Sequence, residues 1–298
     1  MSTVTLTKEY KLTNSGTTSP AETFTFSKLT CTGVSDAGVG VTKDNAPVPE
    51  ISSVSYAVGE AGSTTAKKKI TITLPPYTAV GVYTYTFSEI DGGTAGVSYR
   101  SGAITLVVTV IEQNGKVRVA AVHTEGENEA KSDKFDNEYS AGSLKVSKNV
   151  TGIMGDKQKE FTVKVTFTAP SGDTVREAIT YVDGTETKTI AAGNGWTGSK
   201  EVDITLKHGE TVTFTNIPYG VTYDVVESNY TSDGYDSPSY DFGDAEKKID
   251  SASESVTITN NKGGEVDTGI NMDSMPYILL LAVAFVGLFV FISKKREF

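Results

Sequence analysis

The chain has 298 residues and a formal net charge of −10, a length that suits two ordinary domains or one large all-β domain. Its acidic balance argues against a nucleic-acid partner, because binding to phosphates requires a basic patch. Cys31 is the single cysteine, so no internal disulfide can form, and we interpret this residue as a small buried apolar side chain.

Strand patterns begin close to the N-terminus and continue through the first half of the chain. Hydrophobic and polar residues alternate in residues 21–30, 82–89, 103–112 and 116–124, and a period of two is typical of β-strands. Turn sequences such as DGG and NGK separate these segments. The first half is therefore predicted to consist of short strands joined by turns.

The second half has the same character. Residues alternate in segments 159–168, 210–217 and 255–260, and turn sequences such as DGT, KHGE and IPYG lie between them. No segment before the C-terminal tail has a sustained helical period. Many short strands between turns predict an all-β fold built from β-sandwiches.

An internal repeat divides the chain. The motifs VTLTKEYKL, ETFTFS, GVYTYTFSEIDGG and KFDNEYS follow one another in the first half, and LKVSKNVTG, KEFTVK, GVTYDVVESNY and VTITNNKGG follow in the same order in the second. The boundary falls in the small-residue segment SAGSL, residues 140–144. We therefore expect two tandem β-sandwich domains over residues 1–141 and 142–262.

The C-terminal end has the organisation of a membrane anchor. A linker over residues 263–274 precedes residues 275–292, which carry no charged side chain. This segment is long enough for a transmembrane helix at about 1.5 Å per residue. The basic tail over residues 293–298 places the C-terminus in the cytoplasm and both domains outside the cell. A cytosolic tail-anchored protein is the competing topology, which this placement of charge disfavours.

Export in this orientation requires an N-terminal signal, and the opening sequence MSTVTLTKEY lacks the features of one. We therefore interpret the sequence as a mature form whose signal peptide is absent. Such a protein is expected at the cell surface, with its precursor held in the membrane by the C-terminal helix.

Each half carries a lysine on its first strand, a glutamate after an aromatic-rich strand and an asparagine on its last strand. A single strand lysine or asparagine is more often a solvated edge residue, but the whole set occurs twice, in matching order and in apolar strand contexts. This repetition favours a shared buried site. The two sets are Lys8, Glu89 and Asn137, and Lys148, Glu227 and Asn260.

These residue types have a definite chemistry if they meet in an apolar core. Burial disfavours the charged forms, so the lysine amine becomes a neutral nucleophile and the carboxyl can hold a proton. A protonated glutamate can polarise the asparagine amide and shuttle protons. Attack by the amine would expel ammonia and leave a Lys–Asn isopeptide bond. Each glutamate would act once on its own chain, so the protein is not predicted to be an enzyme.

At these residues the sequence resembles the major shaft pilins of Gram-positive, sortase-assembled pili, in particular the two-domain streptococcal type with isopeptide-linkage domains. The resemblance covers essentially the whole chain and implies an extended rod of two Ig-like domains of the CnaB kind. It also implies one internal isopeptide bond in each domain. The matching motifs are LTK at Lys8, YTFSE at Glu89, FDN at Asn137, LKVSK at Lys148, IPYGVTYDVVE at Glu227 and TITN at Asn260.

The linker sequence EVDTG resembles a sortase sorting signal, formed here by Glu265, Val266, Asp267, Thr268 and Gly269. In the family, a transpeptidase cysteine cuts between the residues that correspond to Thr268 and Gly269. The new Thr268 carboxyl is then joined to a lysine of the next subunit or to the cell wall. The family's usual signal has a proline where this chain has Asp267, so either a dedicated sortase accepts Asp267 or recognition is weaker. The other interpretation is a plain juxtamembrane spacer.

The resemblance also indicates the intersubunit acceptor, which in these pilins lies shortly before the last strand of the first domain. That position points to Lys131, with Lys134 as second choice, although no YPK-type motif is present and a solvated surface charge is the alternative. The implied partners are identical pilin subunits, a pilin-specific class C sortase, minor or tip pilins, cell wall peptidoglycan and a host surface.

Three functions compete: a shaft subunit, a surface adhesin that binds a host or matrix ligand, and a basal pilin. The two halves show no additional binding domain, and the linker lacks the proline-rich tail common in basal pilins, so the shaft is favoured. No metal or cofactor is predicted, because His123 and His208 lie in different halves. The aspartates of residues 233–244 do not follow the order of a calcium loop.

Overall fold

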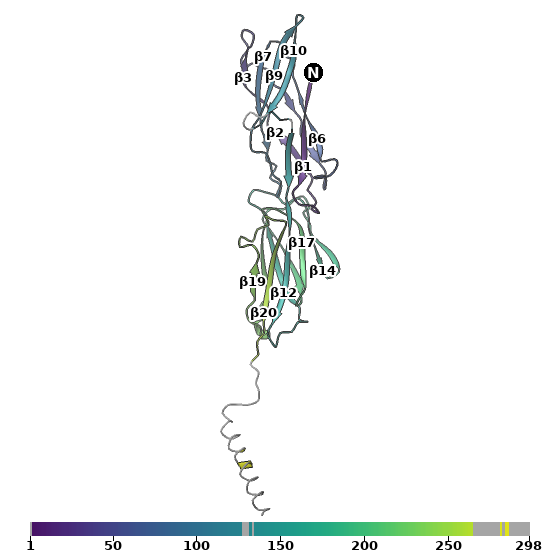
Figure 1. Ribbon diagram of the computed structural model, residues 1–298, viewed down its shortest axis with the longest axis vertical. Coiled ribbons are helices and arrows are strands. Elements are labelled where there is room, and N and C mark those ends of the chain that lie inside the picture. The colour runs from purple at the N-terminus through teal and green to yellow at the C-terminus, as the bar shows by residue number, and fades with distance from the viewer. Residues whose placement is uncertain (1, 127–130, 133, 265–280, 282–283, 286–298) are drawn as a thin grey trace, which may run out of the picture.

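The computed structural model describes residues 2–126, 131–132, 134–264, 281 and 284–285, and its described part is an elongated all-β molecule (Figure 1). The all-β prediction is confirmed. The strands of the first half are β1 (Thr3–Leu12), β2 (Glu22–Phe26), β3 (Thr30–Ser35), β4 (Glu50–Ile51), β5 (Val54–Tyr56), β6 (Lys67–Thr73), β7 (Gly81–Phe87), β8 (Glu89–Ile90), β9 (Ile104–Gln113), β10 (Lys116–Glu125) and β11 (Lys134–Tyr139).

The second half continues directly from β11 through Ser140 into a long strand. A short 3-10 helix over Thr231–Asp233 interrupts an otherwise β-stranded arrangement. The strands are β12 (Ala141–Thr151), β13 (Phe161–Thr168), β14 (Ile179–Asp183), β15 (Glu186–Ile190), β16 (Ser199–Leu206), β17 (Thr211–Pro218), β18 (Thr222–Glu227), β19 (Ser239–Phe242) and β20 (Ser253–Asn261).

Each half packs two main sheets around its own hydrophobic core. In the first half, the sheet β11-β1-β6-β4 packs against β10-β9-β7-β3, and β5-β2-β8 forms a smaller third sheet. In the second half, β15-β14-β17-β12-β20-β19 packs against β16-β13-β18. Cys31 is buried against the first core, as predicted, and burial raises the pKa of its thiol.

The first and last strands of each half lie side by side and run parallel. β1 pairs with β11, and β12 pairs with β20. The buried positions of these strands alternate along the chain, so every second side chain enters the core. This pairing positions the predicted lysines and asparagines, because it joins segments that are separated by most of a domain in sequence.

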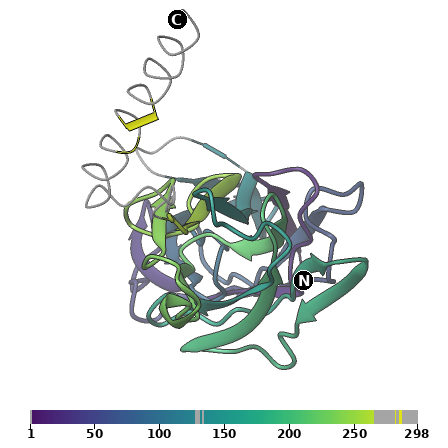
Figure 2. The same cartoon turned by 90° about the horizontal axis from the view of Figure 1, so that it is seen from below.

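The two halves are also connected by hydrogen bonds. Thr94 and Thr174 form an isolated parallel bridge, in which the backbone N–H of Ala95 donates to the carbonyl oxygen of Thr174 (3.0 Å). The Asn14 amide donates to the hydroxyl of Tyr219 (2.7 Å). Seen from below, the hairpin of β14 and β15 projects outward from the rest of the second half (Figure 2).

The C-terminal predictions fall largely outside the described residues. Those that do so are residues 265–274 of the linker, the tail over residues 293–298 and all but three residues of the predicted transmembrane segment 275–292. Among the residues that are described, no helix is long and apolar enough to cross a membrane.

Candidate functional site

The structure brings Lys8, Glu89 and Asn137 together in the core of the first half. Lys8 on β1 is 1% exposed, Asn137 on β11 is 1% exposed and Glu89, the first residue of β8, is 7% exposed. The lysine and the asparagine occupy positions in the strand alternation that otherwise hold apolar side chains such as Leu6 and Phe135. The polar side chains therefore face inward because of strand periodicity.

Hydrogen bonds connect the three side chains of this first cluster. The Lys8 Nζ donates to Glu89 Oε1 (2.5 Å) and to Asn137 Oδ1. The Asn137 Nδ2 donates to Glu89 Oε2 (3.0 Å) and to the carbonyl oxygen of Ser98 (2.7 Å). The backbone N–H of Arg100 also donates to Glu89 Oε2 (2.8 Å). The loop that contains Ser98 and Arg100 thus helps to orient both the carboxyl and the amide.

A second cluster in the other half has the same composition. Lys148 on β12, Glu227 at the end of β18 and Asn260 on β20 are 2%, 6% and 0% exposed. The Lys148 Nζ donates to Asn260 Oδ1 and lies 3.0 Å from Glu227 Oε2. The Asn260 Nδ2 donates to Glu227 Oε1 (2.7 Å). Each glutamate therefore lies next to both the amine and the amide nitrogen of its cluster.

The two clusters are built on the same strand register. In the first half, Lys8 is opposite Phe135, and Asn137 is the next residue of β11 on the same face. In the second half, Lys148 is opposite Ile258, and Asn260 again lies two residues further along. Because side chains alternate with a period of two, each lysine and asparagine share a face and meet diagonally across parallel strands.

An aromatic ring covers the amine in both clusters, a feature that the sequence reasoning missed. The Lys8 Nζ lies 4.3 Å from the ring centroid of Phe24, and the Lys148 Nζ lies 4.2 Å from that of Phe161. Both rings are fully buried. The signal was available, because the two phenylalanines occupy the repeated motifs ETFTFS and KEFTVK.

Burial changes the protonation of the amines. Desolvation lowers the pKa of Lys8 below its ordinary value of 10.5, although the Glu89 carboxyl acts in the opposite direction. The pKa of Lys148 is lowered for the same reason, against the opposing effect of Glu227. A lowered pKa makes the neutral, nucleophilic amine more accessible at moderate pH.

The arrangement can support nucleophilic attack with proton transfer. The glutamate contacts the amine nitrogen and the amide nitrogen at once, so it can take a proton from the first and deliver one to the second. Its contact with the asparagine amide also holds the carbonyl carbon within reach of the lysine. The three groups are a nucleophile, an amide and a proton carrier, which are the groups that amide exchange between two side chains requires.

The remaining predicted residues lie elsewhere. Lys131 and Lys134 are exposed, and Lys131 forms an isolated antiparallel bridge with Glu125. The proposed sorting signal lies outside the described residues. It comprises Glu265, Val266, Asp267, Thr268 and Gly269.

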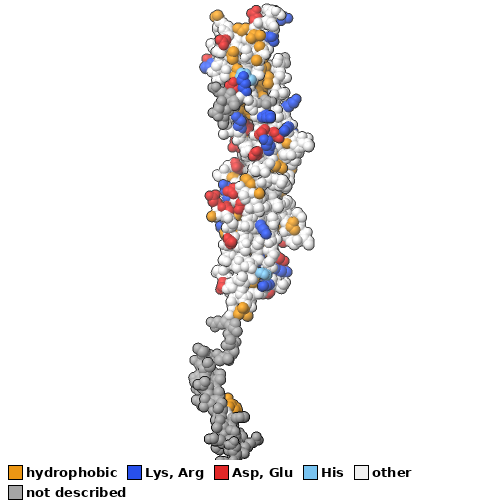
Figure 3. Space-filling model, in the orientation of Figure 1, with side chains coloured by type: hydrophobic (Ala, Val, Ile, Leu, Met, Phe, Trp, Pro, Cys, Tyr) orange, Lys and Arg blue, Asp and Glu red, His pale blue; other side chains and the backbone are white. Residues whose placement is uncertain are grey.

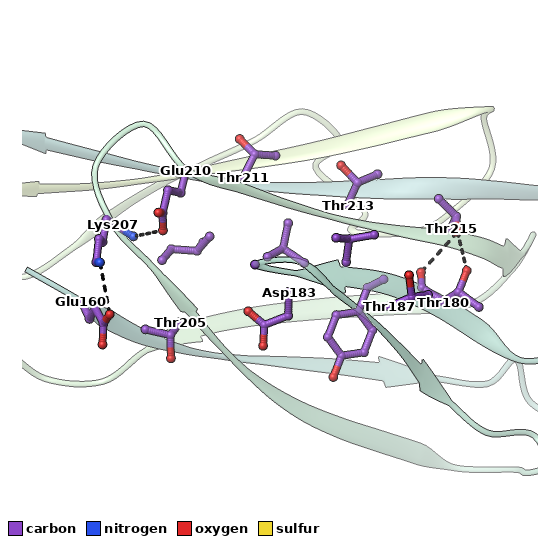
Figure 4. A pocket seen from close by; sticks show the side chains of 15 residues that line it. Glu160, Thr180, Asp183, Thr187, Thr205, Lys207, Glu210, Thr211, Thr213 and Thr215 are labelled. Carbon is purple, nitrogen blue, oxygen red and sulfur yellow. Dashed lines mark hydrogen bonds and ion pairs between the residues drawn. The ribbon is translucent and has the colours of Figure 1, made fainter. Parts of the chain in front are cut away.

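An open groove on the second half is unrelated to these clusters. Its lining comes mainly from β14, β16 and β17 and is rich in threonine, and none of the six cluster residues lines it (Figure 4). Lys207 forms an ion pair with Glu160 (3.3 Å), and the hydroxyls of Thr180 and Thr215 are 2.7 Å apart. These side chains are already paired, so we assign the groove no chemistry.

Comparison with known proteins identifies the family. The chain is 30% identical to a pilin of Streptococcus pyogenes serotype M1 over 315 aligned residues, which cover 98% of this chain and 91% of the relative. The chain belongs to the streptococcal major-pilin family. The family model of the Spy0128-like isopeptide containing domain matches residues 4–140. Residues 142–262 match a domain family of unknown function, DUF7601.

Solved structures and a second relative are also similar to this chain. The crystal structure of the major pilin from S. pyogenes is similar with a TM-score of 0.57 and 25% identity, covering 88% of this chain and 99% of that one. The major pilin T3.2 shares the fold, with a TM-score of 0.58 and 23% identity. The S. pyogenes pilus tip adhesin Cpa is 27% identical over 135 residues, which are 18% of its length.

Proposed function

We propose that this chain is the structural shaft subunit of a covalently polymerised cell-surface pilus. The observation that carries the proposal is the pair of buried Lys–Glu–Asn clusters, which have the same register in both halves. The relatives favour the shaft over the adhesin alternative. The chain covers 91% of the pilin relative but only 18% of the tip adhesin.

In each half, the proposed reaction is an intramolecular amide exchange. The neutral lysine Nζ attacks Cγ of the asparagine and gives up one proton to the glutamate. The bond from Cγ to Nδ2 breaks after the glutamate has transferred a proton to Nδ2. Ammonia leaves, and Nζ and Cγ are joined as an isopeptide bond. No oxidant or cofactor is required, and the glutamate ends in the state in which it began.

One proposed bond lies in each half, so the chain would contain two isopeptide-linkage domains, over residues 1–141 and 142–262. The second cluster lies within residues 142–262, which match a domain family of unknown function. The proposal therefore gives the second domain the same chemistry as the first. Each bond would close its domain by joining the first strand to the last. A load applied to the ends would then act on a covalent bond in place of a ladder of hydrogen bonds.

For polymerisation, we propose that a class C sortase cuts between Thr268 and Gly269 and joins the Thr268 carboxyl to Lys131 of another copy. Lys134 is the second candidate for the acceptor. The exposure of Lys131 is consistent with this role. Other pilins and peptidoglycan would be the remaining partners, and the precursor would be held at the membrane by residues 275–292.

The direct test is the intact mass of recombinant Met1–Gly264. We expect a deficit of two ammonia molecules relative to the sequence mass. Fragmentation should assign the bonds to Lys8 with Asn137 and to Lys148 with Asn260. A mass without a deficit would contradict the proposed chemistry and leave two uncrosslinked β-sandwiches.

A further inference from the structure

A loop over residues 91–100 connects the first cluster to the second half of the chain. It follows β8, whose first residue is Glu89, and precedes β9. The carbonyl oxygen of Ser98 accepts a hydrogen bond from Asn137 Nδ2 (2.7 Å). The backbone N–H of Arg100 donates to Glu89 Oε2 (2.8 Å). The later residues of this segment, which we call the junction loop, therefore orient two members of the cluster.

The earlier residues of the junction loop are held by the second half. The backbone N–H of Thr174 donates to the carbonyl oxygen of Gly93 (2.8 Å), and the backbone N–H of Ala95 donates back to the carbonyl oxygen of Thr174 (3.0 Å). The Arg176 Nε donates to the hydroxyl of Thr94 (2.9 Å). Thr94 is only 2% exposed, so its side chain is shielded from water. Three successive loop residues are thus hydrogen-bonded to the second half.

Packing leaves this part of the junction loop little freedom. The side chain of Ala95 is buried and belongs to the hydrophobic core of the second half. Gly96 has a φ of +79°, and a Cβ built on it would lie 2.6 Å from the carbonyl oxygen of Ser140 and 3.0 Å from Pro218. A larger residue at this position would require the backbone to shift. On the face shown in Figure 3, the two halves form one continuous surface.

The second cluster is oriented from within its own half. The backbone N–H of Glu227 donates to the hydroxyl of Tyr240 on β19 (2.9 Å). The next backbone N–H, that of Ser228, donates to the carbonyl oxygen of Thr162 on β13 (3.0 Å). The two clusters therefore have the same reacting residues but differ in their support, because a loop held by the other half orients the first cluster.

We infer that the second half positions the reacting groups of the first cluster through the junction loop, with Arg176 as a positioning residue. This inference rests on the proposed function, in which Lys8 and Asn137 react. Only two residues separate Ala95 from Ser98, so a displacement of the held residues reaches the cluster through a short stretch of backbone. A misplacement of reacting groups by about 1 Å can lower a rate about 100-fold. The first bond therefore forms at its full rate only when the second half holds the loop.

The rates at which the two bonds form in the full chain test this inference. The chain would be synthesised in a cell-free system with detergent, and samples would be denatured in acid at intervals. Peptide mass spectrometry would then quantify the crosslink between Lys8 and Asn137 and the crosslink between Lys148 and Asn260 separately. The second bond serves as an internal reference in every sample, because its cluster is supported by its own half.

Three variants separate the positioning role from a general effect on the second half. Arg176→Met removes the donor to Thr94, and Arg176→Lys keeps a donor on a side chain of similar length. Lys164→Met is the matched control, because Lys164 is also exposed and its ion pair with Glu201 (2.9 Å) lies within the second half.

We expect the first bond to form roughly fivefold to tenfold more slowly in Arg176→Met than in the unaltered chain, and the second bond to form at an unchanged rate. Arg176→Lys should restore most of the rate of the first bond, and Lys164→Met should leave both rates unchanged. An unchanged first bond in Arg176→Met, equal slowing of both bonds, or no rescue by lysine would overturn the inference. Absence of both bonds from the unaltered chain would instead refute the proposed function.

Discussion

At the residue scale, each cluster buries a lysine amine in the protein core, where a charged group is energetically unfavourable. Lys8 and Lys148 are at least 98% buried, and an isolated ammonium in such a place is strongly disfavoured. The neighbouring carboxyl compensates only in part, since the pKa of both lysines remains lowered. Conversion of the amine into an amide would remove the ionisable group and with it the cost of burying a charge.

The proposed role of the glutamates predicts a separable effect in each domain. Glu89→Gln should abolish the first bond and retain the second, because glutamine keeps the size of the side chain but cannot transfer the proton. Glu227→Gln should do the reverse. Intact mass should show a deficit of one ammonia molecule in each variant.

The matched control is Glu254→Gln, because Glu254 is also buried but accepts a hydrogen bond from Ser251 outside the cluster. This variant should keep both bonds. The loops closed by the two bonds span 129 and 112 residues, for which chain entropy gives about 5 kcal/mol per crosslink. Thermal unfolding should therefore occur at lower temperature in both cluster variants, and an unchanged mass would refute the role of the glutamate.

The lowered lysine pKa predicts a pH dependence in a protein that cannot form the first bond. In Asn137→Ala, the folded state should bind fewer protons at Lys8 than the unfolded state does. The free energy of unfolding should therefore rise with pH, between the folded pKa and the ordinary value of 10.5. Denaturant unfolding between about pH 7 and 9.5 avoids tyrosine ionisation, which begins near pH 10.

The control for this pH dependence is Lys8→Met combined with Asn137→Ala, which removes the amine. The difference between the two slopes reports the removal of the Lys8 amine from the cluster, because both proteins keep all other titratable groups. Equal slopes would contradict a lowered pKa at this lysine.

At the scale of the elements, the parallel pairing of first and last strands selects the reacting residues. Asn260 and Asn261 are neighbours on β20 but point to opposite faces. Asn260 is buried in the cluster, whereas the Asn261 Nδ2 donates to Asp236 Oδ2 (2.7 Å) at the surface. A shift of one residue therefore removes an asparagine from reach of Lys148.

This alternation predicts different outcomes for two adjacent substitutions. Asn260→Ala should lose the second bond, and Asn261 should not replace it. Asn261→Ala should retain both bonds, because it removes only two surface hydrogen bonds, to Asp236 and from Thr151. Intact mass of the two variants provides the test, and a crosslink to residue 261 in Asn260→Ala would show that the register does not control the reaction.

At the scale of the whole molecule, the two clusters are linked by continuous strand. Asn137 lies on β11 and Lys148 on β12, and only Ser140 separates these two strands. The hydrogen bonds around Thr94 and Tyr219 add contacts across this junction. The extended form in Figure 1 thus follows from a direct strand connection and from side contacts that accompany it.

Polymer formation predicts that one exposed lysine is essential. Co-expression of Lys131→Ala with the cognate sortase should abolish the ladder of covalent polymers on a denaturing gel, because the acceptor amine is missing. Lys134→Ala is the matched control, since this lysine is also exposed and lies three residues away, and it should form normal ladders. Normal ladders from Lys131→Ala would exclude Lys131 as the acceptor.

Much of the cluster could be predicted from local patterns. The alternation around Lys8 and Asn137 showed that both side chains share the periodicity of core residues, and the repeated order of motifs selected the glutamates. The contacts from Ser98 and Arg100 could not be predicted, because they depend on how the loop after β8 folds back over the cluster. The position of Phe24 above the amine likewise depends on packing between sheets.

The sequence by itself determined the all-β class, the twofold repeat and the inward-facing polar residues, because strand periodicity is a local property that each segment carries. Only the tertiary structure decided that Lys8 meets Asn137 and that Lys148 meets Asn260. Those contacts depend on the parallel register of β1 with β11 and of β12 with β20. Such a register is set by packing between segments more than a hundred residues apart, and no local pattern encodes it.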